Sequence, residues 1–410
     1  MDPYVLVGGG LTTARAAEAL RTGGYDGDLV VVATEPHHPY ERPPLSKDYL
    51  RGESERDVVF PLDESWYREH DVVVRTGETV VGLDPAGHVL TLSDGATLTY
   101  AKALLAPGSA PRTLDLPGGD LAGVHYLRTI DDSDRISSRL LEASLEGVGR
   151  IVVIGDGWIG LEVAASARSL GLDVTVVGRG SHPLGRVLGP EMGDFYAGVH
   201  TEHGVRVLSR TTVSALRGTD GRVTGVDLAD GTHLGADVVV IGVGAAPNVG
   251  LAEAAGLDLR STTLGGGIAV NGMLTTSHPD VFAAGDVASV PSPHYGRPLR
   301  VEHWSAAQES GAHAGRAMLG DTVAYDKLPY FYSDQYDVGM EYTGWVDVPG
   351  GHDDVVVAGS VDARELVTFW LSDGQVVAGM AVNVWEQMER VDQLIRSRRK
   401  VSREELEGFL

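Results

Sequence analysis

The stretch "VVIGDGWIGLEVAASA" (residues 152–167) sets an apolar, β-branched run before a glycine turn and an alanine-rich helical pattern. Its glycines, Gly155, Gly157 and Gly160, have the spacing G-x-G-x-x-G. In a strand–turn–helix context the first glycine makes a tight turn, the second lets backbone approach a pyrophosphate, and the third lets helix and strand pack closely. The helix N-terminus offers free N–H groups to the phosphates. The stretch therefore predicts a dinucleotide-binding βαβ unit.

Another copy of this unit begins the chain, and it is the first of the two along the sequence. The stretch "VLVGGGLTTARAAEAL" (5–20) aligns without gaps on residues 152–167, and it keeps Gly8 and Gly10. Thr13 replaces the third glycine. A threonine there should push the helix slightly away from the strand, or its hydroxyl should bond nearby backbone. We interpret Thr13 as a tolerated packing change; a weakened nucleotide site is the alternative. Two copies far apart in one chain predict two bound dinucleotides.

The residue that ends the second strand of each unit indicates which ribose the unit holds. In the first copy this residue is Glu35, an acid suited to accept hydrogen bonds from ribose hydroxyls. In the second copy, "VVGRGS" (176–181) has Gly178 at this point and Arg179 after it. Without an acid to repel a 2′-phosphate, and with Arg179 and Arg186 to bind it, the pattern favours NADPH. The alternative is that Arg179 faces solvent and both nucleotides are accepted.

Composition excludes several classes of function. The 410 residues carry 33 basic and 57 acidic side chains, a net charge of -24, so nucleic-acid binding is not expected. No apolar run approaches the roughly 20 residues that span a bilayer, and the first strand starts at once, so we expect a cytoplasmic protein. Cysteine is absent, which excludes disulfides, thiolate metal sites and a redox dithiol. The histidines are scattered, and we expect no metal. If the protein transfers electrons, a bound cofactor must carry them.

Other segments supply groups suited to a flavin. Arg42 and Lys47 lie in a proline-stiffened loop, where Arg42 can reach a pyrophosphate. Asp286 follows a small-residue turn that we expect to open a helix, where the acid can hold a polyol chain. Trp304 and Tyr332 are aromatic side chains suited to bracket a flat ring.

The motifs "RPPLSK", "GWIGLEVA", "VFAAGDVA", "VEHW" and "SDQYD" together resemble the FAD-dependent pyridine-nucleotide oxidoreductases. The chain is most similar to the ferredoxin and rubredoxin reductases that feed cytochromes P450 and ring-hydroxylating dioxygenases, from Val5 to about Val384. The resemblance implies an α/β fold with two Rossmann-like domains and a smaller C-terminal α/β domain. The implied domains are FAD-binding at 1–111 and 245–319, NAD(P)H-binding at 112–244, and C-terminal at 320–410.

The resemblance also implies roles for single residues. Glu162 matches the acidic residue that pairs with Lys47 close to flavin N5, and these two are the implied catalytic residues. Hydride would pass from nicotinamide C4 to flavin N5, and the Lys47 ammonium would favour the anionic reduced flavin. The implied cofactor-binding residues are Gly8, Gly10, Glu35, Arg42, Lys47, Val80, Asp286, Trp304, Tyr332, Gly155, Gly157, Ile159, Gly160, Arg179, Arg186 and Gly244.

The expected function is therefore an NAD(P)H-dependent ferredoxin reductase. With no dithiol in the chain, single electrons would leave reduced FAD for an iron–sulfur ferredoxin of the [2Fe–2S] or a similar type, which feeds a P450 or other oxygenase. An NAD(P)H oxidase or quinone reductase is one alternative, and a slow redox-sensing flavoprotein is another. Pro107 and Tyr332 depart from the family pattern, in which threonine and tryptophan are usual. We expect a monomer or homodimer whose basic docking patch includes "IRSRRK" (395–400), unless that cluster is only a solvated helix end.

Overall fold

The computed structural model describes residues 2–145, 149–347 and 350–410. They form two compact units, each made of separate stretches of the chain. The first unit contains the chain up to Glu41, Arg56–Ala110 and Ala246–Pro329. The second contains Arg42–Glu55, Pro111–Ala245 and Tyr330–Leu410. Two of the passages between the units lie within the short strands β8 (Ser109–Pro111) and β17 (Ala245–Pro247).

A five-stranded parallel sheet, in the order β19-β7-β1-β2-β3, is the centre of the first unit. Its strands are β1 (Tyr4–Val7), β2 (Leu29–Ala33), β3 (Val72–Thr76), β7 (Lys102–Leu105) and β19 (Val281–Ala283). The central strands read as continuous apolar runs, and β2 is buried at every position. This pattern is typical of parallel strands that are covered on both faces.

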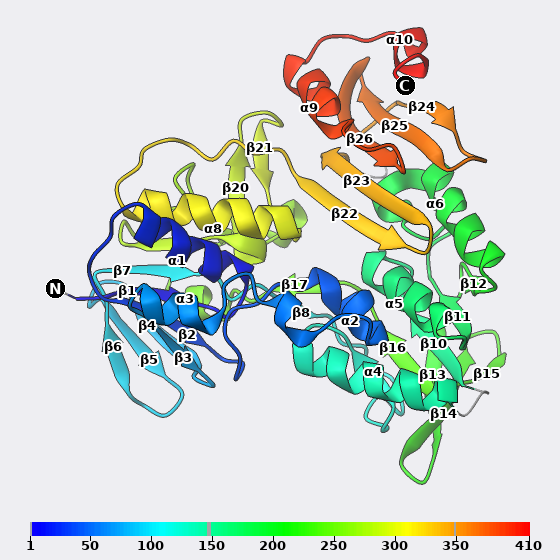
Figure 1. Ribbon diagram of the computed structural model, residues 1–410, viewed down its shortest axis with the longest axis horizontal. Coiled ribbons are helices and arrows are strands. Elements are labelled where there is room, and N and C mark those ends of the chain that lie inside the picture. The colour runs from blue at the N-terminus through cyan, green and yellow to red at the C-terminus, as the bar shows by residue number, and fades with distance from the viewer. Residues whose placement is uncertain (1, 146–148, 348–349) are drawn as a thin grey trace. The chain divides into compact units, whose positions relative to one another are not determined.

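Helices α1 (Leu11–Thr22) and α8 (Trp304–Met318) run side by side in the first unit (Figure 1). Small residues allow their close approach, because a Cβ built on Gly311 would lie 2.3 Å from the backbone oxygen of Thr12. A Cβ on Gly315 would likewise lie 2.7 Å from the oxygen of Ala16. The remaining elements of this unit are β4 (Val80–Asp84), β5 (Val89–Leu92), β6 (Thr97–Thr99), β18 (Ile268–Ala269), β20 (Ala288–Ser292), β21 (Arg297–Leu299), α3 (Glu64–Glu69) and α7 (Gly250–Ala254).

The second unit repeats the parallel arrangement, with strand order β12-β11-β10-β16-β9. The strands are β9 (Val124–Tyr126), β10 (Arg150–Ile154), β11 (Asp173–Val177), β12 (Arg206–Leu208) and β16 (Val238–Ile241). A small antiparallel sheet is added by β13 (Val213–Thr219), β14 (Arg222–Leu228) and β15 (His233–Gly235). The helices around these sheets are α2 (Asp48–Arg51), α4 (Ile130–Leu145), α5 (Trp158–Ser169) and α6 (Gly185–Glu202).

The C-terminal part of the second unit is a five-stranded antiparallel sheet, order β22-β23-β26-β25-β24. Its elements are β22 (Tyr330–Gln335), β23 (Val338–Gly344), β24 (Asp354–Ser360), β25 (Glu365–Ser372), β26 (Gln375–Val382), α9 (Met388–Ser397) and α10 (Arg403–Glu407). Helix α9 lies against β26 and β23 (Figure 1). The buried Trp370 indole donates to the backbone oxygen of Leu188 on α6 at 3.1 Å. This contact ties the C-terminal sheet to α6, the helix between β11 and β12 of the parallel sheet.

Residues 42–55, which the sequence placed in the FAD-binding domain, pack within the second unit. The division into three domains otherwise stays a prediction.

Candidate active site

The glycine turn between β10 and α5 has the geometry that its spacing predicts. Gly155 has φ +119°, and a Cβ there would lie 2.2 Å from the oxygen of Gly242. A Cβ on Gly160 would lie 2.1 Å from the oxygen of Gly155, so helix and strand touch at this point. Gly157, by contrast, has no atom within 4 Å of its Cβ position. The turn therefore leaves open space at the N-terminus of α5, where backbone N–H groups can meet a pyrophosphate.

The turn between β1 and α1 repeats this geometry in the first unit. A Cβ on Gly8 would lie 2.2 Å from the oxygen of Ala106, whereas Gly10 has open space around its Cβ position. Thr13 is fully buried, and its hydroxyl donates to the oxygens of Gly8 at 3.0 Å and Gly10 at 2.7 Å. The Thr13 hydroxyl thus bonds nearby backbone, which is one of the two outcomes expected for this position. Both turns thus fit a dinucleotide.

The Asp286 segment lies against the first turn of α1. A Cβ on Gly285 would lie 2.5 Å from Thr12 Oγ1, and the Gly285 N–H donates to Ser310 Oγ at 3.0 Å. The expectation that a helix opens here is wrong. Gly285–Val287 forms a single 3₁₀ turn, and the chain then enters β20 as an extended strand. The β-branched valines and the prolines of this stretch oppose a helix.

The other residues expected beside FAD in the first unit already have protein partners. The Tyr40 hydroxyl donates to the Glu35 carboxylate. The Trp304 indole, on the first residue of α8, donates to Glu41 Oε2 at 2.7 Å. Val80 is the first residue of β4. The Pro107 oxygen accepts a hydrogen bond from Asn248 Nδ2 at 2.8 Å, so the proline substitution leaves the local backbone satisfied.

In the second unit, the structure brings together the two residues expected to be catalytic. Lys47 Nζ lies 2.9 Å from Glu162 Oε1, and the two side chains are only 12% and 4% exposed. Lys47 follows the 3₁₀ turn Pro43–Ser46, and Glu162 is on α5, directly after the glycine turn. The Lys47 ammonium also lies 5.7 Å from the centre of the Tyr332 ring on β22, within cation–π range. The predicted pairing of Lys47 with Glu162 is therefore present.

Serine hydroxyls complete the surroundings of Glu162. Ser46 Oγ donates to Oε2, and Ser333 Oγ donates to Oε1 at 2.7 Å. Together with Lys47, these donors satisfy a buried carboxylate on both oxygens. Asp334 follows Ser333 on β22. Burial raises the pKa of its carboxyl, and the positive charge of Lys47 only partly offsets this rise.

A polar hollow of about 320 Å³ opens beside Lys47 in the second unit. Its wall includes Lys47, Arg51, Ser166, Asp334 and Tyr336. Lys47 is thus reachable from outside the unit on this side, although its side chain is only 12% exposed.

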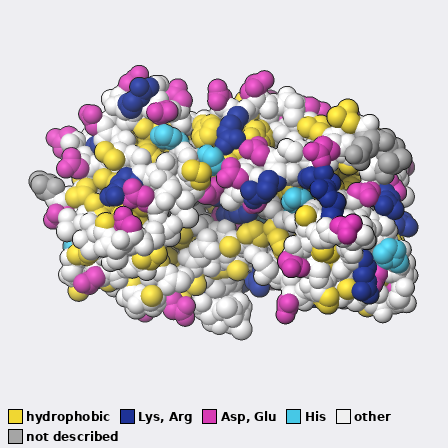
Figure 2. All heavy atoms as spheres, turned by 90° about the horizontal axis from the view of Figure 1, so that it is seen from below, with side chains coloured by type: hydrophobic (Ala, Val, Ile, Leu, Met, Phe, Trp, Pro, Cys, Tyr) yellow, Lys and Arg dark blue, Asp and Glu magenta, His cyan; other side chains and the backbone are white. Residues whose placement is uncertain are grey.

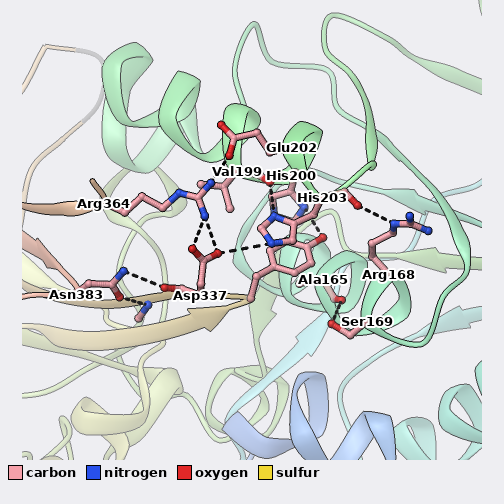
Figure 3. Close-up of polar contacts among 12 residues, drawn as sticks. Ala165, Arg168, Ser169, Val199, His200, Glu202, His203, Asp337, Arg364 and Asn383 are labelled. Atoms are coloured by element: carbon pink, nitrogen blue, oxygen red, sulfur yellow. Dashed lines mark hydrogen bonds and ion pairs between the residues drawn. The ribbon is translucent and has the colours of Figure 1, made fainter. Parts of the chain in front are cut away.

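A buried chain of polar side chains leads from Glu162 through Ser333 to helix α6. Gln335 Nε2 donates to Ser333 Oγ at 3.1 Å, and His200 of α6 lies 2.8 Å from Gln335 Oε1. Burial lowers the pKa of His200 to about 4, so the imidazole is neutral at physiological pH. Figure 3 shows His200 next to His203, whose ring stacks on Tyr336 at 3.8 Å.

Next to His200, a cluster of ion pairs lies at the surface of the second unit. His203 Nε2 lies 3.6 Å from Asp337 Oδ1, and Arg364 joins Asp337 to Glu202 (Figure 3). Asn383 Nδ2 donates to the Asp337 oxygen at 2.9 Å. The cluster fixes the turn after β22, which carries Ser333 and Gln335.

The chain matches two known protein families. Residues 2–311 match the family described as pyridine nucleotide-disulphide oxidoreductase, and residues 330–408 match the reductase C-terminal family. The chain belongs to the pyridine nucleotide-disulphide oxidoreductase family. Its expected FAD and NAD(P)H cofactors and its mixed α/β fold are thereby confirmed. Despite the family's name, the chain has no cysteine.

Its relatives include the ferredoxin–NAD(+) reductase component of the anthranilate 1,2-dioxygenase system of Burkholderia cepacia, 38% identical over 96% of this chain and 94% of the relative. A chloroplastic/mitochondrial monodehydroascorbate reductase of Arabidopsis thaliana is 35% identical over 98% of this chain and 84% of the relative. A crystal structure of the covalent putidaredoxin reductase–putidaredoxin complex matches with a TM-score of 0.92 and 32% identity, over 99% of this chain and 96% of the solved one.

The second unit holds, at the end of β11, a residue that the sequence interpretation missed. The side-chain space beyond Gly178 is filled by the carboxylate of Asp156, so the expectation that no acid stands at this strand end is wrong. Arg179 is exposed on the loop that follows, and Arg186 is exposed in the first turn of α6. His182 is engaged by Asp194 at 2.7 Å.

Other expected nucleotide-site residues lie around the same sheet. Ile159 is 45% exposed in the first turn of α5. The Gly244 oxygen accepts from the Arg112 N–H at 2.8 Å. Arg42, expected at the FAD pyrophosphate, donates to the backbone oxygen of Arg128 within the second unit.

The basic cluster at 395–400 is largely neutralised by neighbouring acids. Arg396 pairs with Asp392 at 2.7 Å, Arg399 pairs with Glu405, and Lys400 pairs with Asp373 at 3.0 Å. Helix α9 ends at Ser397. These contacts favour the solvated helix end over the docking patch. Figure 2 likewise shows basic side chains interspersed with acidic ones on the face it presents.

Within the described ranges, none of the helices combines the length and apolar character needed to cross a membrane.

Proposed function

We propose that this chain is an NAD(P)H-dependent ferredoxin reductase that passes single electrons to an iron–sulfur ferredoxin of a P450 or other oxygenase system. The observation that best supports this function is that the chain has two open glycine turns suited to dinucleotides but no cysteine. Electrons that enter from a nicotinamide nucleotide therefore have no dithiol through which to leave. The ferredoxin reductase relative and the solved complex with putidaredoxin support a ferredoxin as acceptor.

FAD, when bound, supplies the redox chemistry, because it accepts an electron pair and releases single electrons. The contribution of the protein is position and charge. Lys47 holds a fixed ammonium in a largely buried site, and Glu162 neutralises and orients it. The serines on both Glu162 oxygens keep that carboxylate in one rotamer.

The cofactor-binding assignments are part of this proposal. Gly8, Gly10, Glu35 and Asp286 would hold FAD, with Trp304 near its ring system. Gly155, Gly157 and Gly160 would hold the nicotinamide nucleotide. The open Cβ positions of Gly10 and Gly157 support both sets. We also propose a cytoplasmic location, where NAD(P)H is available.

Acceptor kinetics test the proposal. The FAD-loaded protein is reduced anaerobically with one equivalent of NADH or NADPH and mixed with oxidised putidaredoxin or other purified [2Fe–2S] ferredoxins. We expect two ferredoxins to be reduced per flavin, at least 10-fold faster than the flavin reacts with oxygen or benzoquinone. Slow reaction with every acceptor would instead identify a redox-sensing flavoprotein.

A second candidate is a reductase of a small one-electron acceptor, which the monodehydroascorbate reductase relative favours. The same reduced protein is mixed with monodehydroascorbate radical. Rapid reaction with this radical, together with no reaction with any ferredoxin, would establish the second candidate in place of the first.

A further inference from the structure

An acid from the glycine turn after β10 lies at the end of β11. A Cβ built on Gly178 would lie 2.0 Å from Asp156 Oδ2 and 2.4 Å from Asp156 Cγ. A Cβ on Gly180 would lie 3.8 Å from the same oxygen. The Asp156 carboxylate thus occupies the space into which a side chain at position 178 would project. In dinucleotide-binding units, an acid at that position accepts hydrogen bonds from the ribose hydroxyls.

Asp156 is held in this place by the chain around it. It is the residue between the first two glycines of the second turn, and its backbone oxygen accepts from the Leu184 N–H at 2.9 Å. This hydrogen bond ties the glycine turn to the loop that follows β11. Asp156 Oδ2 is buried and lacks a hydrogen-bond partner among the residues that the structure describes. A buried carboxylate oxygen without a donor is costly, and a donor supplied by a ligand removes that cost.

We propose that Asp156 replaces the usual strand-end acid, accepts hydrogen bonds from the adenosine ribose hydroxyls, and selects NADH over NADPH. A 2′-phosphate at that ribose would place negative charge against the carboxylate, which repels it. The inference rests on the proposed use of a nicotinamide nucleotide at this turn. It reverses the preference for NADPH that Gly178 and Arg179 suggested from the sequence.

The arginines nearby oppose this selection, but from a weaker position. Arg179 and Arg186 are exposed, and their charges favour the ionised form of Asp156 while burial raises its pKa. Charges in solvent are screened by water and salt, whereas a buried oxygen interacts through a lower dielectric. The carboxylate therefore decides the preference, and the arginines limit its size.

Binding of non-reducing fragments tests the inference without turnover. The FAD-loaded protein is titrated calorimetrically with ADP-ribose and with its 2′-phosphate. We expect the wild type to bind ADP-ribose about 10-fold or more tightly than the phosphate. Asp156→Asn, which keeps the shape of the side chain, should reduce that ratio at least 5-fold, whereas Arg179→Gln should weaken only the phosphate. Melting temperatures check that both variants are folded.

A swap variant gives a second, independent readout. Asp156→Gly combined with Gly178→Asp moves the acid to the strand end, and removal of the Asp156 side chain makes room for it. The swap should restore the preference for ADP-ribose that Asp156→Gly alone loses. A wild type that favours the phosphate, or an Asp156→Asn variant with an unchanged ratio, would overturn the inference and leave nucleotide use intact. A wild type that binds neither ligand would overturn both.

Discussion

His200 Nε2 donates a hydrogen bond to Gln335 Oε1 at 2.8 Å, and this contact sets the direction of the whole buried chain. Gln335 uses its amide nitrogen to donate to Ser333, so its oxygen must accept and His200 must carry its proton on Nε2. Each successive link then donates towards Glu162, where Ser333 delivers the last hydrogen bond. Hydrogen bonds aligned in this way reinforce one another. The chain therefore holds Glu162 in position through Oε1, the same oxygen that Lys47 contacts.

Breaking the chain at its centre should slow flavin reduction. In Gln335→Leu, the buried His200 N–H loses its acceptor and Ser333 loses a donor, at a cost of about 1–3 kcal/mol in the free energy of unfolding. We expect the rate of FAD reduction by NADH, measured by stopped-flow absorbance, to fall about 10-fold because Glu162 is less well oriented. Tyr336→Phe is the matched control, since its hydroxyl lies 3.4 Å from His200 Nδ1 and should matter little. Equal rates in the two variants would contradict the orienting role.

The buried imidazole should make the protein less stable in acid. Burial lowers the pKa of His200 from 6.5 to about 4 in the folded protein. Between these values the unfolded chain binds a proton that the folded chain does not, so the free energy of unfolding falls as pH falls from 6.5 to 4. The full loss is about 3 kcal/mol. We expect the free energy of unfolding, measured with urea at several pH values in this window, to depend less steeply on pH in His200→Gln, which keeps a donor to Gln335. The same pH dependence in this variant would mean that other groups cause the acid sensitivity.

Local sequence patterns predicted the parts of the site that lie within one supersecondary unit. The glycine turns at Gly8 and Gly155 follow from strand, turn and helix in immediate succession, and both have the expected contacts. The pairing of Lys47 with Glu162 came from family resemblance, because no local pattern joins residues so far apart in sequence. The helix end at Ser397 followed from its own helical pattern.

Tertiary contacts explain what the sequence did not reveal. Ser46 and Ser333 reach Glu162 across 116 and 171 positions, and single serines carry no signal of such partners. Asp156 reaches Gly178 because β10 and β11 are parallel neighbours, a register that neither segment alone specifies. The helix predicted after Asp286 does not form for a local reason, because the valine-containing segment there continues into the strand β20.

Two glycines of one turn should separate binding from stability. Gly157→Ala places a methyl group in open space, so we expect an unchanged melting temperature but at least 10-fold weaker binding of ADP-ribose, because the methyl group blocks backbone approach to the pyrophosphate. Gly160→Ala places a methyl group 2.1 Å from the Gly155 oxygen, so the melting temperature should fall by several degrees. Calorimetric titration and thermal unfolding measure the two effects. If Gly157→Ala bound ADP-ribose as tightly as the wild type, the pyrophosphate would not bind at this turn.

A double-mutant cycle should decide whether Lys47 and Glu162 form a catalytic or only a structural pair. Removal of either partner leaves a largely buried charge without its counter-charge, so Lys47→Met and Glu162→Leu should each cost about 3 kcal/mol in the free energy of unfolding. The double variant replaces the pair by apolar groups and should recover most of that loss. If the ammonium acts on the bound flavin, the double variant stays at least 100-fold slow in FAD reduction by NADH although its stability returns. Recovery of the rate together with stability would make the pair structural, and the catalytic assignment would then be wrong.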